Sequence, residues 1–214
     1  MKHFIFTVLL SALVISFSSC NGNKSNPSPE ASDTTAVQDT VKPQVIMTHS
    51  DTTFNKDSAL IVVSKKDLTL TVYAPVGGDT LAIEAFPVCV GKNKGDKERS
   101  GDMRTPESPA GQPFTITMIQ DASDWVHDFG DGRGSILSYG HWFLRLKTPH
   151  SGIGIHGSTN NENTVPGRAS EGCIRLLDKD IITLKEKYAR VGMPVIVKGE
   201  EQGLLPFEER CLSR

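Results

Sequence analysis

The chain has 214 residues, the length of one ordinary domain with extensions. Its 23 lysines and arginines nearly balance 25 aspartates and glutamates, and because there is no basic block, nucleic acid is excluded as the indicated partner. Four cysteines, at positions 20, 89, 173 and 211, show no Cys-x-x-Cys or Cys/His ligand spacing. We therefore expect neither a metal site nor a cofactor.

Residues 1–19 have the features of an export signal. Lys2 and His3 precede the apolar run from Phe4 to Phe17, which is too short to span a bilayer. Small residues then lead directly into Cys20, in a pattern that resembles the lipobox of bacterial lipoproteins; cleavage as an ordinary signal is the alternative. A lipid on Cys20 would hold the protein on a membrane surface without spanning it. We expect a periplasmic or cell-envelope protein that is lipid-anchored to a bacterial membrane.

The segment 20–57 is rich in Asn, Ser, Pro and Thr and has almost no apolar periodicity. It cannot bury enough apolar surface to offset the entropy of ordering, so we predict a flexible tether. The ordered domain is expected over 58–200, with 201–214 as a C-terminal extension. Export places the domain in an extracytoplasmic setting, where pairing of Cys89 with Cys211 is an open question.

The ordered domain begins with strand patterns. An apolar run over 60–63 and an alternating run over 68–73 flank the polar turn Ser64–Asp67, which predicts a hairpin. A glycine-rich loop is expected over 91–111. Further strands are predicted over 81–90, 114–119, 142–146 and 152–155.

One amphipathic helix follows. Asp178 is expected to cap its start, the apolar positions 181, 184, 188 and 191 recur at helical spacing, and Gly192 is expected to end it. Residues 194–197 then return as a strand. The whole pattern predicts a mainly β domain with one or two helices.

The segment from His156 to Arg175 carries the chemistry. His156 and Cys173 lie 17 positions apart, each beside a glycine and each next to strand-like apolar residues. This arrangement suits a thiol nucleophile and an imidazole base that meet across a loop. The alternative is a buried cysteine and a solvated histidine with no relation to one another.

Across residues 58–200 the sequence resembles the L,D-transpeptidase catalytic domain, or YkuD domain. The resemblance is carried, in family order, by IVVSKKDLTLTVY, VCVG, TPESPAGQPFTI, IGIHG, GCIRL and VGMPVIV. It implies a β-sandwich or barrel with one or two short helices. It also implies a cysteine acyltransferase that acts on peptidoglycan stem peptides.

The resemblance implies a two-step reaction. Cys173 attacks the carbonyl of the L-centre of a tetrapeptide stem and expels the terminal D-residue. An amine from a neighbouring stem then resolves the acyl-enzyme and forms a 3→3 cross-link. With water as the acceptor, the same residues would make an L,D-carboxypeptidase or another peptidoglycan hydrolase. A third alternative is a peptidoglycan-binding lipoprotein that lacks catalysis.

Other residues of the motif receive roles from the same resemblance. His156 is the base, and the backbone carbonyl of Gly157 or Ser158 is expected to orient its ring. Backbone N–H groups around Gly172 and Cys173 are the expected oxyanion donors. Arg175 is expected either to bind charged groups of the substrate or to serve as a structural ion-pair partner.

The chain departs from the family pattern at two places. In Ser170-Glu171-Gly172-Cys173, glutamate stands where the family has histidine. We count Ser170 and Glu171 with the substrate-binding residues, and we expect Glu171 to face away from the thiol or to recognise a substrate amine; an exposed surface acid is the alternative. The glycine-rich loop 122–141 is the second departure and is expected to form a lid or wall, with Tyr139 and Trp142 stacking or hydrogen-bonding there.

Overall fold

The computed structural model describes residues 54–213. The predicted signal, Cys20 and most of the predicted tether lie outside this range. Among the described residues, no helix has the length and hydropathy needed to cross a bilayer.

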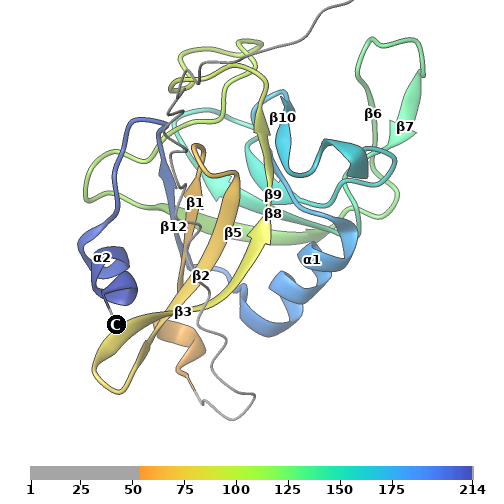
Figure 1. Cartoon of the computed structure of the whole chain (residues 1–214). Helices are drawn as coiled ribbons and strands as arrows, with labels where there is room; N and C mark the ends of the chain where they lie inside the picture. Colours follow the sequence, from red (N-terminus) through yellow and green to blue (C-terminus); the bar gives the residue numbers. More distant parts are fainter. Residues whose placement is uncertain (1–53, 214) are drawn as a thin grey trace, which may run out of the picture. The chain divides into compact units, whose positions relative to one another are not determined.

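The domain is built on a ten-stranded mixed sheet in the order β10-β4-β11-β9-β8-β5-β12-β1-β2-β3 (Figure 1). The strands are β1 (Leu60–Ser64), β2 (Thr69–Val76), β3 (Asp79–Pro87), β4 (Cys89–Gly91), β5 (Phe114–Asp121), β8 (Trp142–Lys147), β9 (Gly154–His156), β10 (Gly167–Ser170), β11 (Ile174–Arg175) and β12 (Pro194–Lys198). A separate hairpin is formed by β6 (Val126–Asp128) and β7 (Ser135–Leu137). The mainly β architecture that the sequence predicts is confirmed.

Helical structure is short. The helices are α1 (Asp178–Thr183), continued by a π-helical turn η3 (Leu184–Tyr188), and α2 (Pro206–Leu212), with 3₁₀ turns at Lys56–Ser58 and Glu162–Thr164. The main core joins the sheet to α1 and η3, whose buried apolar side chains pack together with those of the central strands.

The predicted N-terminal hairpin is confirmed, and β1 lies between β2 and β12 inside the sheet. Its apolar run is continuous because the strand is buried almost throughout. Within this polar turn, Lys65 is fully buried. Its Nζ donates to Glu107 Oε1 at 2.6 Å and to the carbonyl of Gly95 at 2.7 Å. Lys65 thereby fixes the glycine-rich loop to the sheet.

The predicted helix over 178–191 is shorter than its apolar spacing indicated. Leu177, not Asp178, is the N-cap residue, and the helical turns end at Tyr188 because Ala189 is extended. Val191 is consequently 59% exposed instead of buried. Gly192 therefore does not end the helix; it stands in the turn before β12, with a φ of 86°.

The C-terminal extension forms α2 and packs on the outer strands. Phe207 contacts Tyr73 edge to face at 5.1 Å, and Lys198 forms a buried ion pair with Glu208 at 2.6 Å. Cys211 donates from α2 to the carbonyl of Thr80, in β3, whereas Cys89 lies in β4 near the other end of the strand order. Both thiols are free, so the open question of their pairing is answered against a disulfide.

Candidate active site

Strand pairing brings His156 and Cys173 together. β9 and β11 are parallel neighbours in which Ile155 faces Ile174 and His156 faces Arg175. Successive side chains of a strand alternate between its faces, and Ile155 and Ile174 enter the core. His156, Cys173 and Arg175 therefore share the other face, where all three line one pocket of about 280 Å³.

The ring of His156 is buried and held on several sides. Nδ1 lies 2.7 Å from the carbonyl oxygen of Gly157. Because a carbonyl oxygen can only accept a hydrogen bond, the ring proton of the neutral imidazole is on Nδ1, and Nε2 is the basic nitrogen. The Phe143 ring stacks on it with centroids 5.6 Å apart, and the Tyr139 ring lies at 4.8 Å. Burial, followed by the positive charge of Arg175, lowers the pKa of His156 to about 3. The imidazole is therefore neutral at physiological pH.

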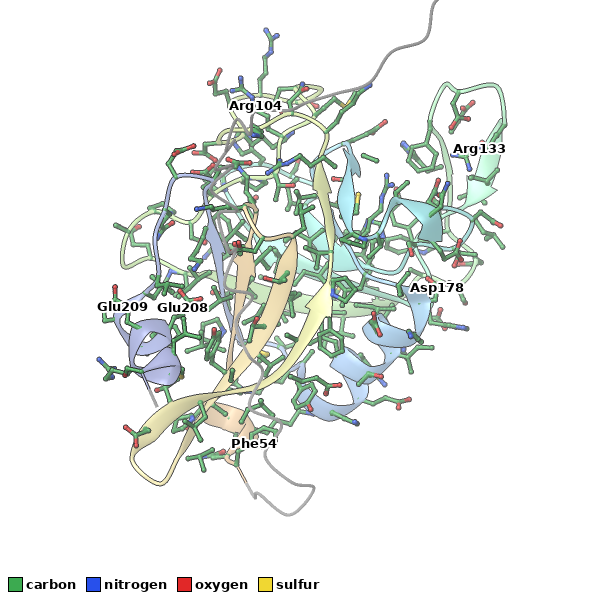
Figure 2. The ribbon with its side chains drawn as sticks, viewed as in Figure 1. Phe54, Arg104, Arg133, Asp178, Glu208 and Glu209 are labelled. Carbon is green, nitrogen blue, oxygen red and sulfur yellow. The ribbon has the colours of Figure 1, made fainter. Side chains whose placement is uncertain are left out.

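The backbone after His156 is braced by α1. Gly157 donates its N–H to Tyr139 O at 2.7 Å, and a Cβ at Gly157 would lie 2.7 Å from Gly140 Cα. Asp178, labelled at the start of α1 in Figure 2, accepts from Ser158 N at 2.7 Å and from the hydroxyl of Thr159. Of the two carbonyls expected to orient the imidazole, the contact is made by Gly157. Asp178 thus stabilises this turn instead of capping its helix with its side chain.

Cys173 is half-buried, and its thiol donates to the Gly152 carbonyl at 3.4 Å. Burial raises the pKa of the Cys173 thiol, although the backbone of Gly154 and the charges of Arg175, Lys97 and Arg145 act in the opposite direction. The resting sulfur is therefore protonated at neutral pH. A nucleophilic role requires a base to remove that proton.

The turn that carries Cys173 is held by Ser170. Its hydroxyl donates to Cys173 O at 2.6 Å and accepts from Gly172 N at 3.1 Å. Gly172 has a φ of 142°, and a Cβ there would lie 2.8 Å from Arg104 O, so only glycine fits. Because the Gly172 N–H is already engaged, it is not a free oxyanion donor as the sequence suggested. The Cys173 N–H makes no hydrogen bond to a described residue and stays the candidate.

Arg175 is 4% exposed and lines the pocket. Its guanidinium lies over the Phe129 ring at 5.1 Å, and no carboxylate of residues 54–213 pairs with it. The structural ion pair considered as an alternative is therefore not found within this range. A buried charge requires a counter-charge or hydrogen bonds to offset its desolvation.

The Glu171 side chain is 47% exposed, in keeping with the alternative of a surface acid, and it points toward the β6–β7 hairpin. Its carboxylate lies 3.3 Å from His127 Nε2, on β6, and both residues line the pocket. His127 was missed from the sequence because it sits in a glycine-rich stretch without strand periodicity. It lies beside the turn that carries Cys173, because its contact partner Glu171 belongs to that turn.

The β6–β7 hairpin forms one wall of the pocket. This is the position in which the sequence placed loop 122–141 as a lid or wall. Phe129 packs on His127 with centroids 4.6 Å apart. Arg133, labelled on the hairpin in Figure 2, donates to Asn160 O at 3.0 Å and to Asn161 Oδ1 at 3.0 Å. These bonds join the hairpin to the loop that follows His156.

One predicted site residue lies outside the pocket, and one residue that was not predicted lines it. Trp142 does not line the pocket; it packs against the main core and carries Lys185 Nζ 4.0 Å above its ring. The cause is strand alternation, because Phe143 takes the face toward His156. Lys97, by contrast, lines the pocket without having been predicted.

Lys97 belongs to a loop organised around Asp102. The Lys97 ammonium donates to Asp102 Oδ1 at 2.7 Å, and three backbone N–H groups also donate to this carboxylate. Although burial opposes the shift, these bonds lower the pKa of the Asp102 carboxyl well below its usual range. The composition of the loop gave no signal for this arrangement.

Glu171 provides a test of the departure from the family motif. In Glu171→His, acylation by a carbapenem, followed by intact mass, should stay within about fivefold of wild type, since a half-exposed polar contact such as that with His127 contributes about 1 kcal/mol or less. The rate of acylation in Glu171→Gln should also stay within about fivefold of wild type. Collapse of acylation in both variants would instead assign the carboxylate a specific task in the reaction.

The family model of the L,D-transpeptidase catalytic domain (YkuD) matches residues 58–197. Similar solved structures include Bd1075 of Bdellovibrio bacteriovorus, with 19% identity and a TM-score of 0.50, covering 75% of this chain and 54% of that one. The helical cell shape determining protein Pgp2 of Campylobacter jejuni has 20% identity and a TM-score of 0.48, with coverage of 72% and 52%. An L,D-transpeptidase from Mycobacterium smegmatis has 20% identity and a TM-score of 0.45, with coverage of 66% and 59%.

This chain thus spans between 52% and 59% of the length of these three structures. At such identities the likeness concerns the fold alone. A comparison with curated protein sequences found no match.

Proposed function

This chain belongs to the L,D-transpeptidase catalytic domain family, and from that membership we propose that it is a peptidoglycan L,D-transpeptidase. The reaction proceeds through an acyl-enzyme on Cys173 and forms 3→3 cross-links between stem peptides. The observation that carries this proposal is the state of His156. Its ring is neutral, its Nδ1 is fixed by Gly157, and it shares a pocket with a protonated thiol.

In acylation, His156 Nε2 takes the proton of the Cys173 thiol while Sγ attacks the carbonyl carbon of the L-centre. A C–S bond forms, and the carbonyl oxygen becomes an oxyanion that the Cys173 N–H stabilises. Collapse of this intermediate breaks the peptide bond. The nitrogen of the departing D-residue receives the proton that His156 holds, and a thioester remains.

In deacylation, the amine of a second stem attacks the thioester carbonyl and passes a proton to His156. The C–S bond breaks, the sulfur regains a proton, and the new amide is the 3→3 cross-link. The base and nucleophile thus return to their starting states. Neutral His156 suits both halves of the cycle because it can accept a proton at the start of each.

Arg175 supports a substrate that carries carboxylates. Its guanidinium lines the pocket without an acidic partner among the described residues, and it is more than nine-tenths buried. A guanidinium binds a carboxylate with two parallel hydrogen bonds. We assign Arg175 to a carboxylate of the stem peptide.

The nature of the acceptor is tested by product analysis. The mature protein is incubated with a disaccharide tetrapeptide, and the products are followed by mass spectrometry. A cross-linked dimer that has lost one D-residue is expected. Tripeptide as the sole product would contradict cross-linking and assign the same Cys/His site to an L,D-carboxypeptidase.

A further inference from the structure

The pocket that holds Cys173 has an uneven distribution of charge. Among residues 54–213, Glu171 is the only carboxylate that lines it, and Lys97 and Arg175 are the lysine and arginine that do. The Glu171 side chain is 47% exposed, whereas Arg175 is 4% exposed. A solute in the pocket can therefore reach the Glu171 carboxylate, while the cationic groups lie deeper.

The Glu171 carboxylate is held on the side of the pocket that the β6–β7 hairpin forms. Its Oε2 lies 3.3 Å from His127 Nε2, and its Oε1 makes no hydrogen bond or ion pair with a described residue. The backbone that follows is fixed, because the Ser170 hydroxyl accepts from Gly172 N and donates to Cys173 O. One carboxylate oxygen is thus available to a ligand, two residues from the thiol.

The two acceptors that compete for the proposed acyl-enzyme differ in charge. An amine is mainly an ammonium at neutral pH, since the α-amino group titrates near 7.7–8.0 and the lysine side chain near 10.4. Water has no charge. A carboxylate attracts an ammonium, and a guanidinium such as that of Arg175 repels it. Glu171 therefore supplies the attraction that an amine needs in order to enter this pocket, and it gives water no such advantage.

We propose that Glu171 is the residue that selects the acceptor: its carboxylate binds the ammonium group of the second stem peptide and favours the amine over water. This inference rests on the proposed function, because it requires an acyl-enzyme on Cys173 that an amine resolves. It assigns Glu171 to the second half of the reaction, so acylation by a carbapenem does not depend on it.

The protons of the acceptor balance in this scheme. The bound ammonium releases one proton to solvent, and Arg175 favours this loss because a like charge disfavours the charged form of the amine. The neutral amine then attacks the thioester carbonyl and passes a second proton to His156. The C–N bond forms, and the C–S bond to Cys173 breaks.

The test compares the products of wild type and Glu171→Gln after incubation with the disaccharide tetrapeptide. Cross-linked dimer and tripeptide are measured together by mass spectrometry. The ratio of dimer to tripeptide should fall about two- to fivefold in Glu171→Gln, the size of one partly exposed charge interaction. Glu171→Asp should recover part of the ratio, because it restores a carboxylate. Added salt should lower the ratio more strongly in wild type than in Glu171→Gln, because ions screen exposed charges.

Hydroxylamine, which is uncharged at neutral pH, separates an effect of charge from general damage to the site. The ratio of tripeptide hydroxamate to tripeptide should be equal in wild type and Glu171→Gln. Glu162→Gln is the matched control, since Glu162 is exposed and does not line this pocket. It should keep the wild-type ratio of dimer to tripeptide.

The inference is overturned if wild type forms dimer and Glu171→Gln keeps the same ratio of dimer to tripeptide. It is also overturned if transfer to hydroxylamine falls as much as transfer to the stem amine, because the loss would then not depend on charge. A wild-type protein that forms tripeptide without dimer would contradict the proposed cross-linking itself, and this inference with it. The products of the wild type therefore distinguish the two failures.

Discussion

Replacing Cys173 with alanine should abolish the covalent carbapenem adduct that the wild-type protein is expected to form. The thiol is the group that would open the β-lactam, and alanine has no nucleophile to replace it. Turnover of tetrapeptide should fall on the order of 10⁴- to 10⁶-fold, as when other covalent catalysts lose their nucleophile. Intact-mass spectrometry measures the adduct, and product analysis measures the turnover.

Cys211→Ala supplies the control for this experiment. Cys211 is also a partly buried free thiol, but it lies in α2 and donates to the carbonyl of Thr80, away from the pocket. Its variant should keep the adduct. An adduct that persists in Cys173→Ala would place the nucleophile elsewhere, and a wild-type protein without adduct would favour the non-catalytic lipoprotein.

Replacing His156 with alanine should lower the rate of acylation by about 10²–10⁴-fold, the usual contribution of a general base. Burial holds the pKa of His156 at about 3, below the value near 6.5 of a free imidazole. The basic form is therefore retained as the pH falls through neutrality and is lost only near pH 3. Burial also raises the pKa of the Cys173 thiol, so without the base the nucleophilic thiolate is scarce at pH 7.

The pH profile of acylation distinguishes this role from a structural one. Wild type should show a level rate between the pKa of His156 and that of the thiol. His156→Ala should instead gain about tenfold per pH unit below the thiol pKa, because only the thiolate fraction reacts. His141→Ala, at an exposed histidine outside the pocket, should keep the wild-type profile. Near-normal acylation of His156→Ala at pH 7 would remove this residue from the mechanism.

The proximity of His156 and Cys173, the proposed catalytic pair, was predictable because its signals are local. The apolar neighbours Ile155 and Ile174 indicate buried strands, and strand alternation then turns His156 and Cys173 to the same side. The glycines beside them are required by backbone approach, as the contacts of Gly172 and Gly157 demonstrate. Such features depend on only a few consecutive residues, so they can be recognised in the sequence.

The rest of the site depends on contacts between distant segments. β6 and β7 have three residues each, too few for an alternating pattern, so the partnership of His127 with Glu171 had no sequence signal. Lys65 reads as a turn residue, yet the carbonyls and carboxylates around its Nζ compensate its burial.

The position of β12 in the sheet has a consequence for biosynthesis. This strand follows Cys173 in the sequence, lies between β5 and β1, and joins the strands of the site to the β1–β2 hairpin. During synthesis the chain must therefore reach residue 198 before the two halves of the sheet have their connecting strand. Until then the ten-stranded sheet next to Cys173 is incomplete. The two residues proposed for catalysis thus receive their complete sheet only after residue 198 has been made.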